Sequence, residues 1–232
     1  MNRLLGILMF ILTSISLYGQ ADASLKAHYH KILDNALKVR DSDAAIHALH
    51  GIIALDSNIL YKDTLSMLYF SNKAYYSALV LAEEVVRKAP SNVEAYGRAA
   101  ECYQYLGEFK TAVNYFEQIA AVTKSPYYLY KLAVAQYSLK RLAECEDNCK
   151  KVIADTTAGK IGVLFVNTDG TDQLIPVSAA AKNLAGVIYM EAKNYAEAVR
   201  LFKDALTIFP QFAGASDNLK ACESAMMKEK KK

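Results

Sequence analysis

The chain has 232 residues, of which 53% are hydrophobic and 22% are charged, and it contains four cysteines and no tryptophan. This composition excludes a disordered chain, a collagen-like fibre and a small disulfide-rich domain. The net charge is only +3, and three of the lysines are the last three residues, so we expect no nucleic-acid partner.

The N-terminus has the pattern of a secretory signal peptide. Arg3 precedes an apolar run over residues 4–18, and the small residues Gly19, Ala21 and Ala23 follow it. An apolar run of about fifteen residues is shorter than the roughly 20 that a membrane-spanning helix needs. We therefore expect residues 1–21 to be a signal peptide, with the mature chain starting between residues 20 and 24. The alternative is an uncleaved membrane anchor.

A signal peptide implies that the folded part of the chain is exported. We expect a periplasmic protein, with the extracellular space or an association with the cell envelope as alternatives. No cysteine lies near the predicted cleavage site, so a lipoprotein anchor has no attachment atom there.

Helical segments then repeat at a nearly fixed interval. In three places an aromatic residue precedes an alanine by three positions, at Ala78, Ala112 and Ala198, and weaker copies end at Ala45 and Cys145. These five positions are separated by 33, 34, 33 and 53 residues. Apolar residues recur at helical spacing within each interval. A period of this size is typical of a solenoid whose helix-turn-helix units stack on one another.

The repeated units resemble tetratricopeptide repeats. The last unit matches the family pattern best, with Gly186, Tyr189, Ala198, Phe202 and Pro210 at the family's spacing. The fourth unit is degenerate, because cysteines at 145 and 149 replace the alanine and phenylalanine of the pattern. The resemblance implies an all-α fold: a right-handed α-solenoid of about five helix hairpins with a C-terminal capping helix.

The expected parts follow from this period. They are a signal peptide at 1–21; a solenoid at 24–228 with units at 26–58, 59–92, 93–125, 126–154 and 178–212 and a cap at 213–228; an insertion at 155–177; and a basic tail at 229–232.

The insertion has the pattern of a β-hairpin. Apolar and β-branched residues flank Asp169-Gly170, a dipeptide that suits a tight turn. An isolated hairpin is marginal in water, so its apolar side chains must pack on the solenoid. Those side chains are Val163, Phe165, Leu174 and Ile175. The favoured interpretation is that the hairpin covers the convex surface or a junction between units. The alternative is that it folds over the groove or offers its edge to a partner strand.

Signals of enzyme chemistry are weak. The chain has no Gly-rich phosphate loop, no nucleophile elbow and no Cys-x-x-Cys motif. All four histidines, at 28, 30, 47 and 50, fall in the first unit, but we expect them on diverging faces, which disfavours a metal site. The acidic residues near Asp169 do not match a calcium loop. The cysteines lie in predicted helices as small buried residues, and we expect no disulfide. We predict a protein that is not an enzyme and has no metal or cofactor.

In the tetratricopeptide family, ligands lie along the concave surface built by the first helix of each unit. Carried over by position, that groove contains Asp63, Met67, Phe70, Glu94, Glu101, Tyr105, Tyr127, Tyr130, Tyr137, Asn183 and Met190. The tyrosines would supply contact area for a protein partner, and the carboxylates would make the N-terminal half acidic. The lysine and asparagine clamp that some members use for a C-terminal carboxylate is missing.

The resemblance implies a scaffold that binds a segment of a partner protein in this groove. One alternative is a self-associating structural component of a cell-envelope assembly. The other is a metal-dependent enzyme, for which only the histidines argue.

Overall fold

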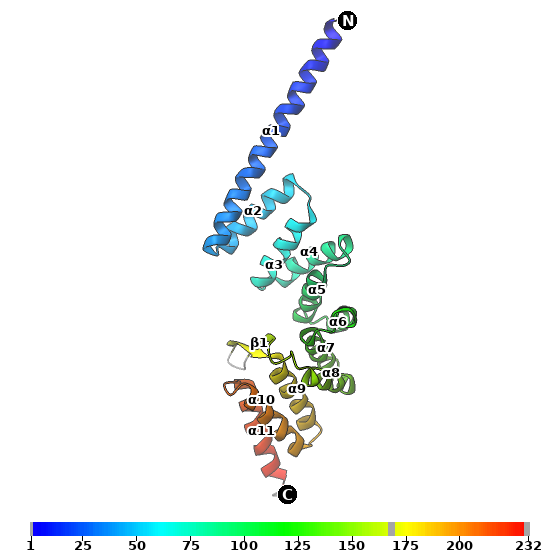
Figure 1. Cartoon of the computed structure of the whole chain (residues 1–232), viewed down its shortest axis with the longest axis vertical. Helices are drawn as coiled ribbons and strands as arrows, with labels where there is room; N and C mark the ends of the chain where they lie inside the picture. The colour runs from blue at the N-terminus through cyan, green and yellow to red at the C-terminus, as the bar shows by residue number, and fades with distance from the viewer. Residues whose placement is uncertain (1, 167–169, 230–232) are drawn as a thin grey trace. The chain divides into compact units, whose positions relative to one another are not determined.

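The computed structural model describes residues 2–166 and 170–229, with the backbone alone for residues 2–20. Within these ranges the chain forms eleven helices and one two-stranded sheet (Figure 1). The helices are α1 (Asn2–Val39), α2 (Ser42–Leu55), α3 (Ile59–Ser71), α4 (Tyr75–Lys88), α5 (Val93–Tyr105), α6 (Phe109–Thr123), α7 (Pro126–Ser138), α8 (Leu142–Ala154), α9 (Val177–Glu191), α10 (Tyr195–Ile208) and α11 (Ala213–Glu229). The strands β1 (Gly162–Val166) and β2 (Asp172–Pro176) lie between α8 and α9.

The predicted fold class is confirmed: consecutive helix hairpins with one β-hairpin inserted among them. Asp169 of the predicted turn, Asn167 and the last three lysines lie outside the described residues. Where side chains are described, the chain has no helix with enough length and apolar character to cross a membrane.

The chain divides into two compact units, residues 1–102 and 103–232. The first contains α1 to α4 and most of α5. The second contains the end of α5, the helices α6 to α11 and the β-hairpin.

The first helix of every hairpin ends in the same way. One residue in the turn adopts a left-handed conformation, with φ between 59° and 84°, at Arg40, Lys73, Gly107, Lys140 and Lys193. The N–H of the following residue donates to a carbonyl five residues back, at 2.8–2.9 Å in all five turns. This is the Schellman arrangement, which satisfies a carbonyl that the helix end leaves open. The left-handed positions repeat at the interval that the alanines showed in the sequence.

Small buried residues bring the two helices of each hairpin together. The repeat positions Ala45, Ala78, Ala112, Cys145 and Ala198 are all at most 1% exposed. Close approach is also visible between α9 and α10, where a Cβ on Gly186 would lie 2.5 Å from the ring of Phe202. A larger side chain at such a position would overpack the helix junction.

The β-hairpin packs one of its faces on the second unit. Val163 pairs with Ile175 across the strands, and both side chains are buried. Phe165, on the same face, meets Phe212 edge to face with ring centroids 4.8 Å apart. The Gln173 side chain donates to the backbone carbonyl of Gln211 at 2.6 Å. These contacts attach the hairpin to the connection between α10 and α11, while both strands also contact α9.

The other face of the hairpin is apolar and exposed. Leu164 pairs with Leu174, and their side chains are 61% and 65% exposed. The prediction that Leu174 packs on the solenoid is therefore wrong, because alternate residues of a strand point to opposite faces and Ile175 occupies the inner one.

The left-handed turns generate a stability prediction. Changing Lys193→Gly should raise the free energy of unfolding by about 0.5–1 kcal/mol, because glycine adopts this conformation without the steric penalty that other residues incur. Urea unfolding of the full chain measures the change.

The matched control is Lys203→Gly in the middle of α10. It should lower the free energy of unfolding by about 1 kcal/mol, since glycine is unfavourable inside a helix. A loss of stability in both variants would contradict the assignment of the turn.

Candidate partner-binding site

The predicted groove residues are divided between the two units. Asp63, Met67 and Phe70 on α3, and Glu94 and Glu101 on α5, belong to the first unit. Tyr105 at the end of α5, Tyr127, Tyr130 and Tyr137 on α7, and Asn183 and Met190 on α9 belong to the second.

Two of the three predicted groove carboxylates in the first unit are paired or buried. Asp63 forms an ion pair with Arg98 and accepts a hydrogen bond from Asn92 at 3.0 Å. Glu101 is buried, whereas Glu94 is exposed. Arg98 comes from a position 35 residues further along the chain, so sequence spacing gave no sign of this pairing.

The two apolar residues of the first group differ in exposure. Met67 is 48% exposed, and Phe70 is half-buried with its ring edge-on to Tyr75 at a centroid distance of 5.7 Å. These positions form no continuous acidic surface within the first unit.

Three residues of the second group connect helices. Asn183 is buried and accepts a hydrogen bond from the Asn218 side chain at 2.9 Å, which links α9 to α11. Tyr137 donates to the Glu191 carboxylate and so links α7 to α9. Burial, together with this bond, raises the pKa of Tyr137 to about 12. Met190 is half-buried against Phe202 and its neighbours.

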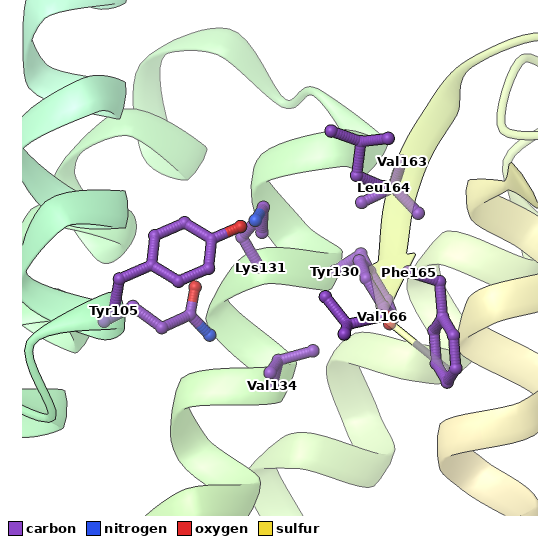
Figure 2. Close-up of a pocket in the computed structure, with 9 residues that line it drawn as sticks. Tyr105, Tyr130, Lys131, Val134, Val163, Leu164, Phe165 and Val166 are labelled. Carbon is purple, nitrogen blue, oxygen red and sulfur yellow. The ribbon is translucent and has the colours of Figure 1, made fainter. Parts of the chain in front are cut away.

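The remaining tyrosines lie at or near a cavity of about 230 Å³ in the second unit (Figure 2). It is lined by Gln104, Tyr105, Tyr130, Lys131, Val134, Val163, Leu164, Phe165 and Val166. Figure 2 shows Tyr105, Lys131 and Val134 on the helical side, with Leu164 and Val166 extending from β1. The hairpin thus contacts α9 and the connection between α10 and α11, and the cavity lies between β1 and the lining residues of α5 and α7.

Burial gives the two tyrosines at the cavity different roles. Tyr130 is 6% exposed and belongs to the core around Cys145 and Cys149. Its burial raises the pKa of the phenol far above its usual value. Tyr105 is 44% exposed. Tyr130 thus forms part of the floor, and Tyr105 offers contact area to a ligand.

Lys131 introduces a positive charge beside the aromatic rings. Its Nζ lies 5.5 Å from the centroid of the Tyr105 ring and 5.7 Å from that of Tyr127. These distances fit cation–π contacts, which hold the ammonium against the ring faces. Among the nine described residues that line the cavity, Lys131 is the one charged side chain.

Sequence reasoning found Tyr105 and Tyr130 and missed the other residues at this cavity. The helical interval from Tyr130 to Val134 places both on one side of α7, and this could have added Val134. The contribution of β1 depends on where the insertion folds, which no local pattern specifies.

Comparison with known proteins agrees with the architecture. Residues 93–124 and residues 179–212 each match a tetratricopeptide repeat model. These two segments therefore have the sequence pattern of tetratricopeptide repeats. No curated protein matches its sequence.

Solved structures with this fold are similar over most of the chain. MamA shares 20% identity with a TM-score of 0.65, covering 78% of this chain and 96% of MamA. YrrB shares 16% identity with a TM-score of 0.65, covering 83% and 90%. A tetratricopeptide repeat protein from Parabacteroides merdae shares 14% identity with a TM-score of 0.69, covering 90% and 76%. These likenesses establish the solenoid fold.

The histidines of the first unit contact tyrosines. His50 Nε2 lies 2.8 Å from the hydroxyl of Tyr69, and His30 Nε2 lies 3.3 Å from that of Tyr61. Throughout the described part of the chain, no three histidine, cysteine or acidic side chains gather in a way that could hold a metal ion.

The four cysteines are buried free thiols. Burial raises the pKa of Cys102 to about 12 and also raises that of Cys222. The pKa of Cys149 is raised by its hydrogen bond with Cys145 and by burial. A thiol with a raised pKa is a poor nucleophile, because the thiolate is the reactive form.

We therefore expect the native protein to resist thiol reagents. At pH 8 a chromogenic disulfide reagent should modify fewer than about one thiol per chain within minutes, and all four after denaturation. Reaction of two or more thiols in the native protein would contradict the buried placement.

Proposed function

We propose that this chain is an exported, non-enzymatic scaffold that binds a segment of a partner protein. The binding site is the cavity in the second unit between the end of α5, α7 and β1. The observation that carries the proposal is the apolar surface at this cavity, where Tyr105, Leu164 and Val166 are 44%, 61% and 58% exposed.

Several exposed apolar side chains lie together at one cavity, and such a group indicates an interaction site. Scattered exposed apolar residues are normal on protein surfaces, but a contiguous group marks a site of contact. Covering such a group contributes roughly 25 cal/mol for each Å² of apolar surface removed from water. Tyrosine adds a large contact area at a low cost in side-chain entropy.

A related fold supports peptide binding. YrrB is described as a tetratricopeptide repeat protein with an unusual peptide-binding site. At 16% identity this likeness concerns the fold, so the choice of site in our chain rests on its own residues.

Export is consistent with the packing of α1. Residues 21–25 are exposed, and the contacts of this helix begin with the ion pair between Lys26 and Asp56 and with Tyr29 in the core of the first unit. Cleavage between residues 20 and 24 would therefore remove no buried side chain from the described part of α1.

Export predicts a defined mature terminus. Intact-mass and N-terminal peptide analysis of the protein from its native cells should find a chain that starts between residues 20 and 24. A chain that retains residues 2–18 would contradict cleavage and favour the membrane anchor.

The binding site can be tested by crosslinking in the native cell envelope. A photoreactive aromatic residue in place of Tyr105 should crosslink to one predominant partner. The same residue in place of Tyr76, which is 71% exposed on α4, is the control and should not. Adding Val134→Glu should reduce the Tyr105 crosslink about tenfold, because a charge would face an apolar partner.

Two results would contradict the site. One is an equal yield from both crosslinking positions. The other is a Tyr105 crosslink that Val134→Glu leaves unchanged while the circular dichroism spectrum shows that the variant folds.

A further inference from the structure

The β-hairpin has two edges, and the hydrogen-bond register shows which groups face each. Ile161 C=O accepts from Val177 N–H at 2.8 Å, so these residues form a hydrogen-bonded pair at the base of the hairpin. Because bonded and non-bonded pairs alternate in an antiparallel ladder, Val163 and Phe165 bond to β2. The N–H and C=O groups of Gly162, Leu164 and Val166 point away from β2, toward the outer edge of β1.

The outer edge of β2 is poorly suited to pairing. Its outward-facing positions are Asp172, Leu174 and Pro176. Proline has no N–H to donate, and a charge on an edge strand discourages pairing. The outward positions of β1 contain no proline and no charged residue. All three therefore keep an N–H group that could pair with another strand. Within the described residues, β1 pairs with no strand other than β2.

The cavity lies along this open edge. Its lining includes all four residues from Val163 to Val166 and none from β2. Tyr105, Lys131 and Val134 form the opposite wall. Unpaired backbone groups and an apolar wall therefore border the same space.

We propose that an extended segment of the partner protein binds in this space as a third strand on β1. The inference rests on the proposed function and specifies how that site recognises its ligand. Strand addition derives affinity from backbone hydrogen bonds and selectivity from pockets for alternate side chains. Apolar side chains of the segment contact Leu164, Val166 and Val134.

A segment fits this space better than a second copy of the chain. A second copy that offered its own β1 edge would also bring the α7 wall that borders that edge. Pairing the β1 edges of two copies would force the α7 walls of both copies into the space beside the paired strands, where they would clash. A single extended segment brings no such wall.

The experiment uses synthetic peptides and the mature chain. The probe is a fluorescent, capped octapeptide of alternating valine and threonine. Two further versions carry N-methyl groups on one or the other set of alternate backbone nitrogens. In a strand only one set bonds to β1. We therefore expect one N-methylated version to lose at least about tenfold in affinity and the other to retain binding.

Matched proline variants test which edge is used. Leu164→Pro removes an N–H from the outer edge of β1, and Leu174→Pro removes one from the outer edge of β2, directly across the ladder. Neither N–H bonds the two strands to each other. Leu164→Pro should weaken binding about tenfold or more, while Leu174→Pro should change it less than about twofold.

Amide hydrogen exchange in the unaltered chain provides a measurement that does not depend on the folding of either variant. Bound peptide should slow exchange at Leu164 at least about tenfold and leave Leu174 unchanged.

Several outcomes would overturn strand addition. They are no binding of the probe at millimolar concentration, equal effects of the two N-methylated versions, or no protection of Leu164. A dimer that Leu164→Pro dissolves would assign the edge to a second copy instead. If these tests fail while the Tyr105 crosslink to a partner persists, the scaffold function stands and only the strand mechanism is wrong. If the crosslink also fails, both are wrong.

Discussion

The structure depends on the close approach of two helices across a short turn. A small residue at the start of each second helix is buried, and a left-handed residue in the turn reverses the chain so that this residue meets the first helix. A single hairpin of this kind cannot bury its apolar surface alone, so its neighbours must cover it. The result is a series of similar helix hairpins along the chain.

The β-hairpin insertion gives the second unit an unusual apolar surface. A hairpin packed on a core normally has one apolar face and one polar face. Here Val163 and Ile175 are buried on the inner face, yet Leu164 and Leu174 on the outer face are apolar as well. Phe212 and the α10–α11 connection cover the inner face. In the described chain, the outer face has no comparable cover. An apolar outer face is unfavourable in water unless something else covers it, which agrees with a role in binding.

Electrostatics contribute less to the candidate site than the sequence indicated. Asp63 is compensated by Arg98, and Glu101 is withdrawn from solvent. At the cavity in the second unit, the one charged residue of the described lining, Lys131, is also buried, at 7% exposed. The surface that this cavity offers is therefore mainly apolar.

The sequence by itself determined the helices, their period and the existence of the hairpin. These features depend on local spacing: apolar residues at helical intervals, small residues at the repeat positions, and β-branched runs around a turn dipeptide. It could not indicate that Arg40, Lys73, Lys140 and Lys193 are left-handed, because lysine and arginine carry no preference for that conformation. Only the tertiary structure decided that Tyr130 is buried, that Asp63 is paired, and that β1 borders a cavity with α7. Each of these depends on contacts between residues at least fifteen positions apart, which form only when the helices pack together.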